Sequence, residues 1–135
     1  MNVNDFLLQV NSNLNNVICV DFDGVIHNNN LGFHDGTCYG LPIEGTLKSL
    51  KSLSKKYKII IFTCKANPNR PLIDGKTGIE LVWEWLEKYD IKKYIEDVTF
   101  TKPNAMAYID DKAIKFESWE QIQSELKLEE IKWVK

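Results

Sequence analysis

The sequence lacks any apolar run that approaches the roughly 18 residues needed to cross a membrane. It also lacks an amino-terminal basic stretch followed by an apolar core and a small-residue cleavage site, the pattern of an export signal. We therefore expect a protein that neither spans a membrane nor is exported. Repeats and low-complexity tracts are absent as well. A length of 135 residues suits one folded unit, so we expect residues 1–135 to form a single domain.

Cysteine is scarce, with three residues in the chain: Cys19, Cys38 and Cys64. An odd number without C-x-x-C spacing argues against a disulfide framework and against a zinc site. Reduced thiols persist in a reducing compartment, so we expect a cytoplasmic protein.

An excess of charge of one sign is also missing. Seventeen Lys and Arg residues stand against nineteen Asp and Glu residues, a formal net charge of −2. This balance argues against a protein that binds nucleic acid or a membrane surface mainly through charge. A small anionic substrate remains compatible with it, provided that positive charge is concentrated locally.

What the sequence does contain is a pair of closely spaced carboxylates after a short apolar run. Residues 17–20 are continuous, apolar and mostly β-branched, which predicts a buried strand. Asp21-Phe22-Asp23-Gly24 follows at once, so the strand ends in D-x-D-G. Two acidic side chains so close repel each other unless a cation lies between them, which suits a Mg²⁺ site with a carboxylate able to attack an electrophile. The alternative is an acidic turn.

Strands and helices are predicted to alternate along the chain. The predicted helices cover residues 5–14, 45–55 and 77–90, and a last helix begins at Ser118; the predicted strands cover 17–20, 58–63, Val98 with Phe100, and 105–109. Alternation of this kind predicts right-handed βαβ units, a mainly parallel sheet and helices on both faces. We therefore expect an α/β, three-layer Rossmann-like sandwich, with residues 27–43 as a small flap. Trp83 and Trp119 are expected to anchor the core.

Polar side chains lie at or directly after the carboxyl ends of three of these predicted strands. They are Asp21 with Asp23, Thr63, and Asp110 with Asp111. Ligands of parallel sheets bind beyond the carboxyl ends of the strands, so we expect these five side chains to meet in one site.

The same residues resemble the four motifs of the haloacid dehalogenase-like (HAD) superfamily, over about residues 17–116. The motifs are D-x-D after the first strand, Ser or Thr after the second, a Lys, and an acidic pair after a later strand, matched here by Asp21 and Asp23, Thr63, Lys102, and Asp110 with Asp111. The resemblance implies a HAD-like sandwich. The Asp at position 23 favours a phosphatase or mutase, because the dehalogenase branch lacks this second acid and transporting ATPases carry Thr there.

The resemblance also implies catalytic roles. Asp21 would attack phosphorus to form an aspartyl-phosphate, and Asp23 would protonate the leaving alcohol and then activate water. Mg²⁺ would be held by the Asp21 side chain, the Asp23 backbone carbonyl and Asp110, with Asp111 bound directly or through water.

Thr63 would donate to phosphoryl oxygens, and a lysine would neutralise negative charge. Lys102 matches the motif lysine, but the acidic pair begins only eight positions after it, at Asp110. Many family members place a whole helix there. Lys65 therefore stays open as the alternative.

The chain has no room for a cap domain, either in the flap or between Thr63 and Lys102. A capless site is open, and the flap or a neighbouring subunit of a homo-oligomer would close it. Candidate substrate contacts are Gly24, His27, Cys64, Lys65 and Arg70. For His27 the alternative is a local hydrogen-bonding role, and for Cys64 it is packing.

We expect a hydrolase: a Mg²⁺-dependent phosphatase of a small phosphorylated metabolite, such as a sugar phosphate or a nucleotide. A second reading keeps the chemistry but takes 3′-phosphorylated nucleic-acid ends, which the weak net charge disfavours. A third is a regulatory module that binds phosphate and turns over poorly.

Overall fold

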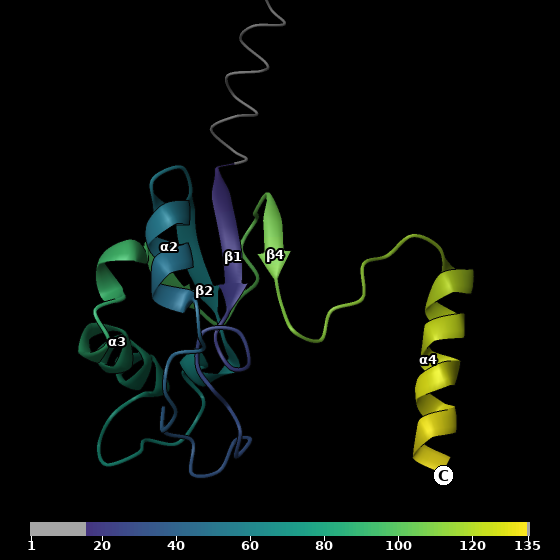
Figure 1. Cartoon of the computed structure of the whole chain (residues 1–135). Helices are drawn as coiled ribbons and strands as arrows, with labels where there is room; N and C mark the ends of the chain where they lie inside the picture. The colour runs from purple at the N-terminus through teal and green to yellow at the C-terminus, as the bar shows by residue number, and fades with distance from the viewer. Residues whose placement is uncertain (1–15, 135) are drawn as a thin grey trace, which may run out of the picture.

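A computed structural model describes residues 16–134, and the expected helix over 5–14 lies outside them. Four parallel strands form one sheet in the order β3-β2-β1-β4, of which β2, β1 and β4 are labelled in Figure 1. Their bounds are β1 Val17–Asp21, β2 Lys58–Phe62, β3 Asp97–Thr99 and β4 Ala107–Ile109. The mixed α/β fold and the parallel sheet are thus confirmed. Since all four strands run the same way, their carboxyl ends lie at one edge of the sheet.

The core lies against one face of this sheet. The pairings of Ile18 with Ile59, and of Val20 with Ile61 and then Val98, place these five side chains on the same face. All five are buried. The strands therefore present a continuous apolar layer on this face.

Helices α2 (Thr46–Ser54) and α3 (Gly78–Lys88) cover the core face, contributing Leu50 and Leu86 to its buried cluster. The Thr77 N-cap predicted for α3 is confirmed, but the Glu80 carboxylate pairs with the Thr77 hydroxyl rather than with the Thr77 backbone N–H of a full capping box. The Oγ1 of Thr77 accepts the Glu80 backbone N–H at 3.2 Å and donates to the Glu80 carboxylate at 3.0 Å.

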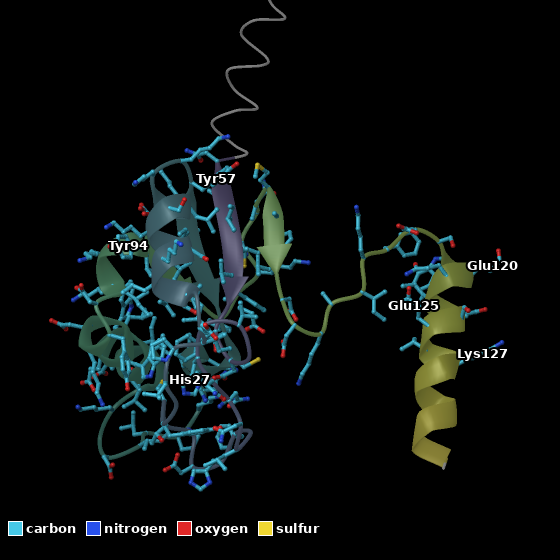
Figure 2. The ribbon with its side chains drawn as sticks, in the orientation of Figure 1. His27, Tyr57, Tyr94, Glu120, Glu125 and Lys127 are labelled. Carbon is cyan, nitrogen blue, oxygen red and sulfur yellow. The ribbon has the colours of Figure 1, made fainter. Side chains whose placement is uncertain are left out.

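The opposite face carries Cys19, Ile60 and Tyr108, which alternate with the core residues. Tyr108 is 44% exposed. Helix α4 (Trp119–Val134) stands apart from the sheet (Figure 1), and its labelled side chains Glu120, Glu125 and Lys127 lie far from the strands (Figure 2). Within residues 16–134 no helix packs on this face, so a second helical layer stays a prediction.

Tryptophan placement differs from the expectation. Trp83 packs partly buried against the core, but Trp119 is 71% exposed because α4 does not pack on the sheet. The buried tryptophan of α3 is Trp85, which is 4% exposed. Phe100 also lies outside β3. No helix within the described segment has the length and apolar character that crossing a membrane requires.

The flap is a loop whose two ends are tied together. Asn28 donates its backbone N–H to the Leu41 carbonyl, and Ile43 donates to the Ile26 carbonyl, both at 2.9 Å. Ile26 is 1% exposed and belongs to the core. The flap is therefore fixed at its base beside the carboxyl end of β1.

Candidate active site

Three carboxylates meet at the carboxyl edge of the sheet. Asp21 ends β1, and Asp110 with Asp111 follows the neighbouring strand β4. One oxygen from each of the three lies within 4.8 Å of the others. The parallel pairing of β1 with β4 brings together acids that are far apart in the sequence, as expected.

The environment of these carboxylates changes the pKa of Asp21. Burial, together with the negative charges of Asp110, Asp111 and Asp23, raises the pKa of Asp21 to about 6. A hydrogen bond of 2.8 Å from the Phe22 backbone N–H acts in the opposite direction. The negative charge of the cluster is therefore under-compensated by the protein itself.

The donor set of this cluster fits a small divalent cation. Carboxylate oxygens are the ligands that Mg²⁺ prefers, and two or three of them leave positions for water and a phosphate. The backbone also makes room for the Asp111 carboxylate at Gly24. A Cβ added at Gly24 would collide with Oδ2 of Asp111, and the φ of +85° at this position suits glycine. Asp21, Asp110 and Asp111 thus present the side-chain oxygens of a site able to hold Mg²⁺, and the expected contact from the Asp23 backbone carbonyl stays a prediction.

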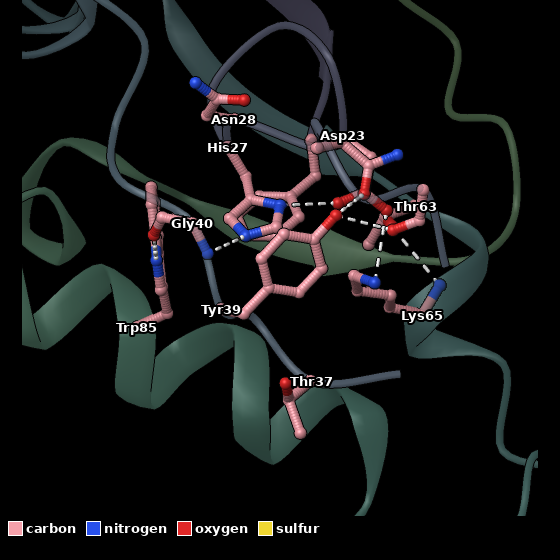
Figure 3. A network of polar contacts seen from close by, with 12 residues as sticks. Asp23, His27, Asn28, Thr37, Tyr39, Gly40, Thr63, Lys65 and Trp85 are labelled. Atoms are coloured by element: carbon pink, nitrogen blue, oxygen red, sulfur yellow. Dashed lines mark hydrogen bonds and ion pairs between the residues drawn. The ribbon is translucent and has the colours of Figure 1, made fainter. Parts of the chain in front are cut away.

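Asp23 lies in a different environment from the cluster. Its Oδ1 is 2.8 Å from Nδ1 of His27, and its Oδ2 is 3.4 Å from Nζ of Lys65 (Figure 3). Burial acts to raise the pKa of Asp23, but the His27 hydrogen bond and the Lys65 charge outweigh it, so the pKa lies below its usual value. The two carboxylates of D-x-D therefore have pKa values displaced in opposite directions.

His27 is fully buried, with no exposed side-chain surface. Its Nε2 accepts the Gly40 backbone N–H at 2.8 Å, and the Gly40 carbonyl accepts from Nε1 of Trp85 at 2.8 Å. The imidazole also stacks on Phe22, with ring centroids 5.1 Å apart. His27 therefore reaches the site only through Asp23, and this structure gives it no surface for a substrate.

Thr63 and Lys65 come from the turn after β2. Thr63 is the N-cap of the short helix η1 (Cys64–Ala66), and its Oγ1 accepts the Lys65 backbone N–H at 3.2 Å. Its hydroxyl hydrogen is left to donate elsewhere. This turn brings the Lys65 ammonium to Asp23, although the side chain is only 3% exposed.

Lys102 lies elsewhere, as an exposed side chain whose Nζ is 4.5 Å from the Tyr108 ring centroid. It lines a cavity of about 170 Å³ together with Asp21 and Asp110. Lys102 forms no ion pair within 4.0 Å among residues 16–127. The two candidate lysines therefore flank different carboxylates: Lys65 is beside Asp23 and Lys102 is near the cluster.

A cavity of about 700 Å³ opens over these groups. It is lined by Asp21, Asp23, Gly24, Asn28, Asn29, Asn30, Gly32, Ile43, Thr63, Cys64, Asp111 and Lys112. Gly24 and Cys64, two of the candidate substrate contacts, therefore line this cavity. Sequence reasoning named the flap only as a whole and missed Lys112, although this residue directly follows the acidic pair.

Arg70 lines a separate cavity of about 240 Å³, shared with Lys65 and Phe33. Its guanidinium carbon lies 4.9 Å from the Phe33 ring centroid. In this structure Arg70 is therefore a partner of the flap rather than part of the cavity over the carboxylates.

Comparison of the chain with protein-family models, with curated proteins and with solved structures found no match.

Proposed function

We propose that this protein is a Mg²⁺-dependent phosphomonoesterase, of the capless HAD-like kind that its four motifs resemble. The observation that carries the proposal is the meeting of Asp21, Asp110 and Asp111 within 4.8 Å, beside a second acid, Asp23, with separate partners. Structural ion-pair networks also shift pKa values, but an under-compensated acidic cluster in a cleft is typical of a catalytic or metal site.

The proposed chemistry divides one displacement into two. An Asp21 oxygen attacks phosphorus, the bond from phosphorus to the leaving oxygen breaks, and the protonated form of Asp23 gives that oxygen its proton. Asp23 then takes a proton from water, which attacks phosphorus and releases inorganic phosphate and free Asp21. Bound Mg²⁺ supplies charge neutralisation and orientation of the phosphoryl oxygens.

The surrounding residues support these steps. The Thr63 hydroxyl lines the cavity and has its hydrogen available for a phosphoryl oxygen. Lys102, near Asp21 and Asp110, is the proposed motif lysine, because it lies on the side of the nucleophile. Lys65 is the proposed partner of the acid–base residue Asp23.

The proposed substrate is a small phosphorylated metabolite, since a cavity of about 700 Å³ suits a ligand of that size. A formal net charge of −2 offers little attraction for a nucleic acid. We propose with it that the domain is a three-layer HAD-like sandwich, in which a second layer of helices covers the other face of the sheet.

A phosphomonoester panel tests this function. Sugar phosphates, nucleotides and 3′-phosphorylated oligonucleotides are assayed with and without Mg²⁺, using wild type and Asp21→Asn. Metal-dependent phosphate release that Asp21→Asn abolishes supports the proposal, and a preference for oligonucleotides redirects it to nucleic-acid ends. Binding of phosphorylated ligands without turnover, in both proteins, overturns it in favour of a phosphate-binding module.

A further inference from the structure

We infer that His27 is a positioning residue that fixes the carboxylate of Asp23 for its acid–base role, and this inference rests on the proposed function. The residue touches no substrate, because its side chain is completely buried. Its effect on the reaction would pass through one hydrogen bond, the 2.8 Å contact from Nδ1 to Oδ1 of Asp23.

The hydrogen-bond partners determine which tautomer His27 adopts. A backbone N–H can only donate, so Nε2, which faces the Gly40 N–H at 2.8 Å, must carry a lone pair. The ring hydrogen of a neutral imidazole is then on Nδ1, pointing to the Asp23 carboxylate. His27 is thus a neutral donor whose hydrogen has one acceptor, and rotating the ring by 180° would break both contacts.

The imidazole itself is held from three further sides. Phe22 stacks on it nearly parallel, with an angle of 2° between the rings. Trp85 and Tyr39 meet it edge-on, with centroids 5.4 and 5.2 Å away. Because the ring has no freedom to turn, the direction of its Nδ1–H is set by the core and the base of the flap rather than by solvent.

Among Asp23, His27 and Lys65, only Asp23 has an appreciably exposed side chain, and it lines the cavity. Its side chain is 27% exposed, against 0% for His27 and 3% for Lys65. One oxygen faces each partner, so the plane of the carboxylate is fixed, while each oxygen keeps a lone pair that can carry the proton passed to the leaving oxygen or taken from water. An acid–base group must lie within hydrogen-bond reach of the leaving oxygen, and small misplacements are costly. His27 would provide this alignment.

His27 also holds the flap, through its hydrogen bond with Gly40. The Gly40 N–H donates to His27, and the Gly40 carbonyl accepts from Trp85 on α3. The carboxyl-terminal part of the flap is therefore joined to the His27 imidazole. A Cβ at Gly40 would collide with the Asn28 carbonyl, so only glycine allows this approach. The position of the flap and the orientation of Asp23 are therefore coupled through one side chain (Figure 3).

Two amide substitutions separate positioning from packing. In His27→Asn the amide N–H occupies the place of Nδ1 and can donate to Asp23, whereas in His27→Gln the amide lies closer to the place of Nε2. We expect kcat to fall roughly 10- to 100-fold in His27→Gln, with KM within about threefold of wild type. His27→Asn should recover kcat to within about fivefold of wild type.

His34 offers a matched control, because it is the only other histidine and is exposed on the same flap. Its φ is +52°, which asparagine tolerates, so His34→Asn should leave kcat unchanged. Thermal unfolding of each variant, with and without Mg²⁺, verifies that the folded metal-binding protein is being compared. Equal loss in His27→Asn and His27→Gln, or wild-type kcat in both, overturns the inference while leaving Asp21-dependent activity in place.

A spectroscopic readout keeps the test independent of turnover. In His34→Asn protein only His27 contributes imidazole ¹⁵N signals, and we expect a protonated Nδ1, an unprotonated Nε2 and slow exchange of the Nδ1 hydrogen. An Nε2–H tautomer overturns the inference even in an active enzyme. If no phosphomonoester is hydrolysed by wild type, the proposed function fails and the positioning role fails with it, whereas the tautomer result still reports the His27–Asp23 contact.

Discussion

The Nζ of Lys65, a side chain that is only 3% exposed, lies 3.4 Å from Oδ2 of Asp23. A buried ammonium needs a partner of opposite charge, and Asp23 is the partner here. The pKa values of the two D-x-D carboxylates are consequently displaced in opposite directions. Against the opposing effect of burial, the His27 hydrogen bond and the Lys65 charge lower the pKa of Asp23, whereas burial and the neighbouring acids raise that of Asp21.

Substitution of Lys65 by Met should raise the pKa of Asp23, because the Lys65 charge helps to lower it. The titration midpoint of the Asp23 ¹³Cγ signal should therefore move to higher pH, and any limb of the pH–rate profile that belongs to Asp23 should move with it. The depressed pKa also stabilises the folded state at pH values above the unfolded pKa of about 3.9, and this contribution is lost on acidification. It should be smaller in the variant.

Lys76→Met is the control for this titration, since Lys76 is an exposed lysine paired with Glu84. It should leave the Asp23 midpoint unchanged. An unchanged midpoint in Lys65→Met as well would show that the buried ion pair does not govern Asp23.

Mg²⁺ should bind more tightly at pH 7 than at pH 5. With its pKa raised to about 6, Asp21 is mostly protonated at pH 5 in the metal-free folded protein, and that proton must leave before the oxygen binds metal. Competition of this kind weakens the apparent affinity about tenfold at pH 5. The rise in Tm at a fixed Mg²⁺ concentration should accordingly be larger at pH 7.

The Tm of the metal-free protein should depend on pH because the pKa of Asp21 is raised in the folded state. An acid whose folded pKa is raised destabilises the metal-free fold as pH increases from about 4 to about 6, so the Tm without Mg²⁺ should fall across this range while the Mg²⁺-induced increment grows. Asp110→Asn should weaken binding but keep the pH trend. An equal Mg²⁺-induced rise in Tm at pH 5 and pH 7 in wild type would contradict the role of Asp21 as a metal ligand.

Substitution of Gly24 by Ala should remove the metal response. The new Cβ would collide with the Asp111 carboxylate, and the backbone at φ +85° would be strained by about 1–2 kcal/mol. We expect a lower Tm, no further rise of Tm with Mg²⁺, and loss of phosphatase activity.

Gly32→Ala is the matched control for this change. Gly32 has φ +67° but no atom within 4 Å of an added Cβ, so the variant bears the backbone strain without the collision. Its Tm should fall similarly while the response to Mg²⁺ persists. Loss of that response in both variants would mean that strain alone disrupts the site.

The three thiols should differ in reactivity towards iodoacetamide at pH 8. Burial raises the pKa of Cys38 to about 12, despite the opposing charge of Lys65, and burial raises the pKa of Cys19 as well. About one Cys38 thiol in ten thousand is then ionised at pH 8, and only the thiolate reacts. Cys64 is exposed, so it should be alkylated first.

Peptide mass mapping after a time course measures the three rates separately. In denaturant all three cysteines should react at similar rates, which provides the control. Alkylation of Cys38 in the folded protein as fast as that of Cys64 would contradict the burial described for Cys38.

The sequence predicted those parts of the fold and site that depend on local pattern. The strand at residues 17–20, the helix capped by Thr77, and the parallel sheet follow from apolar periodicity and capping chemistry, which are encoded over a few residues. The meeting of Asp21 with Asp110 and Asp111 was predictable too. Strands that run parallel must end at the same edge of the sheet, whatever lies between them in sequence.

The tertiary structure alone decided how the supporting residues are arranged. The burial of His27 depends on Gly40 and Trp85, two residues 45 positions apart whose contact no local pattern encodes. The pairing of Lys65 with Asp23 depends on the turn after β2 passing beside the turn after β1. The exposure of Trp119 depends on whether α4 packs on the sheet. Each outcome is set by side-chain packing between distant segments, and a single sequence carries no signal of that packing until the chain is folded.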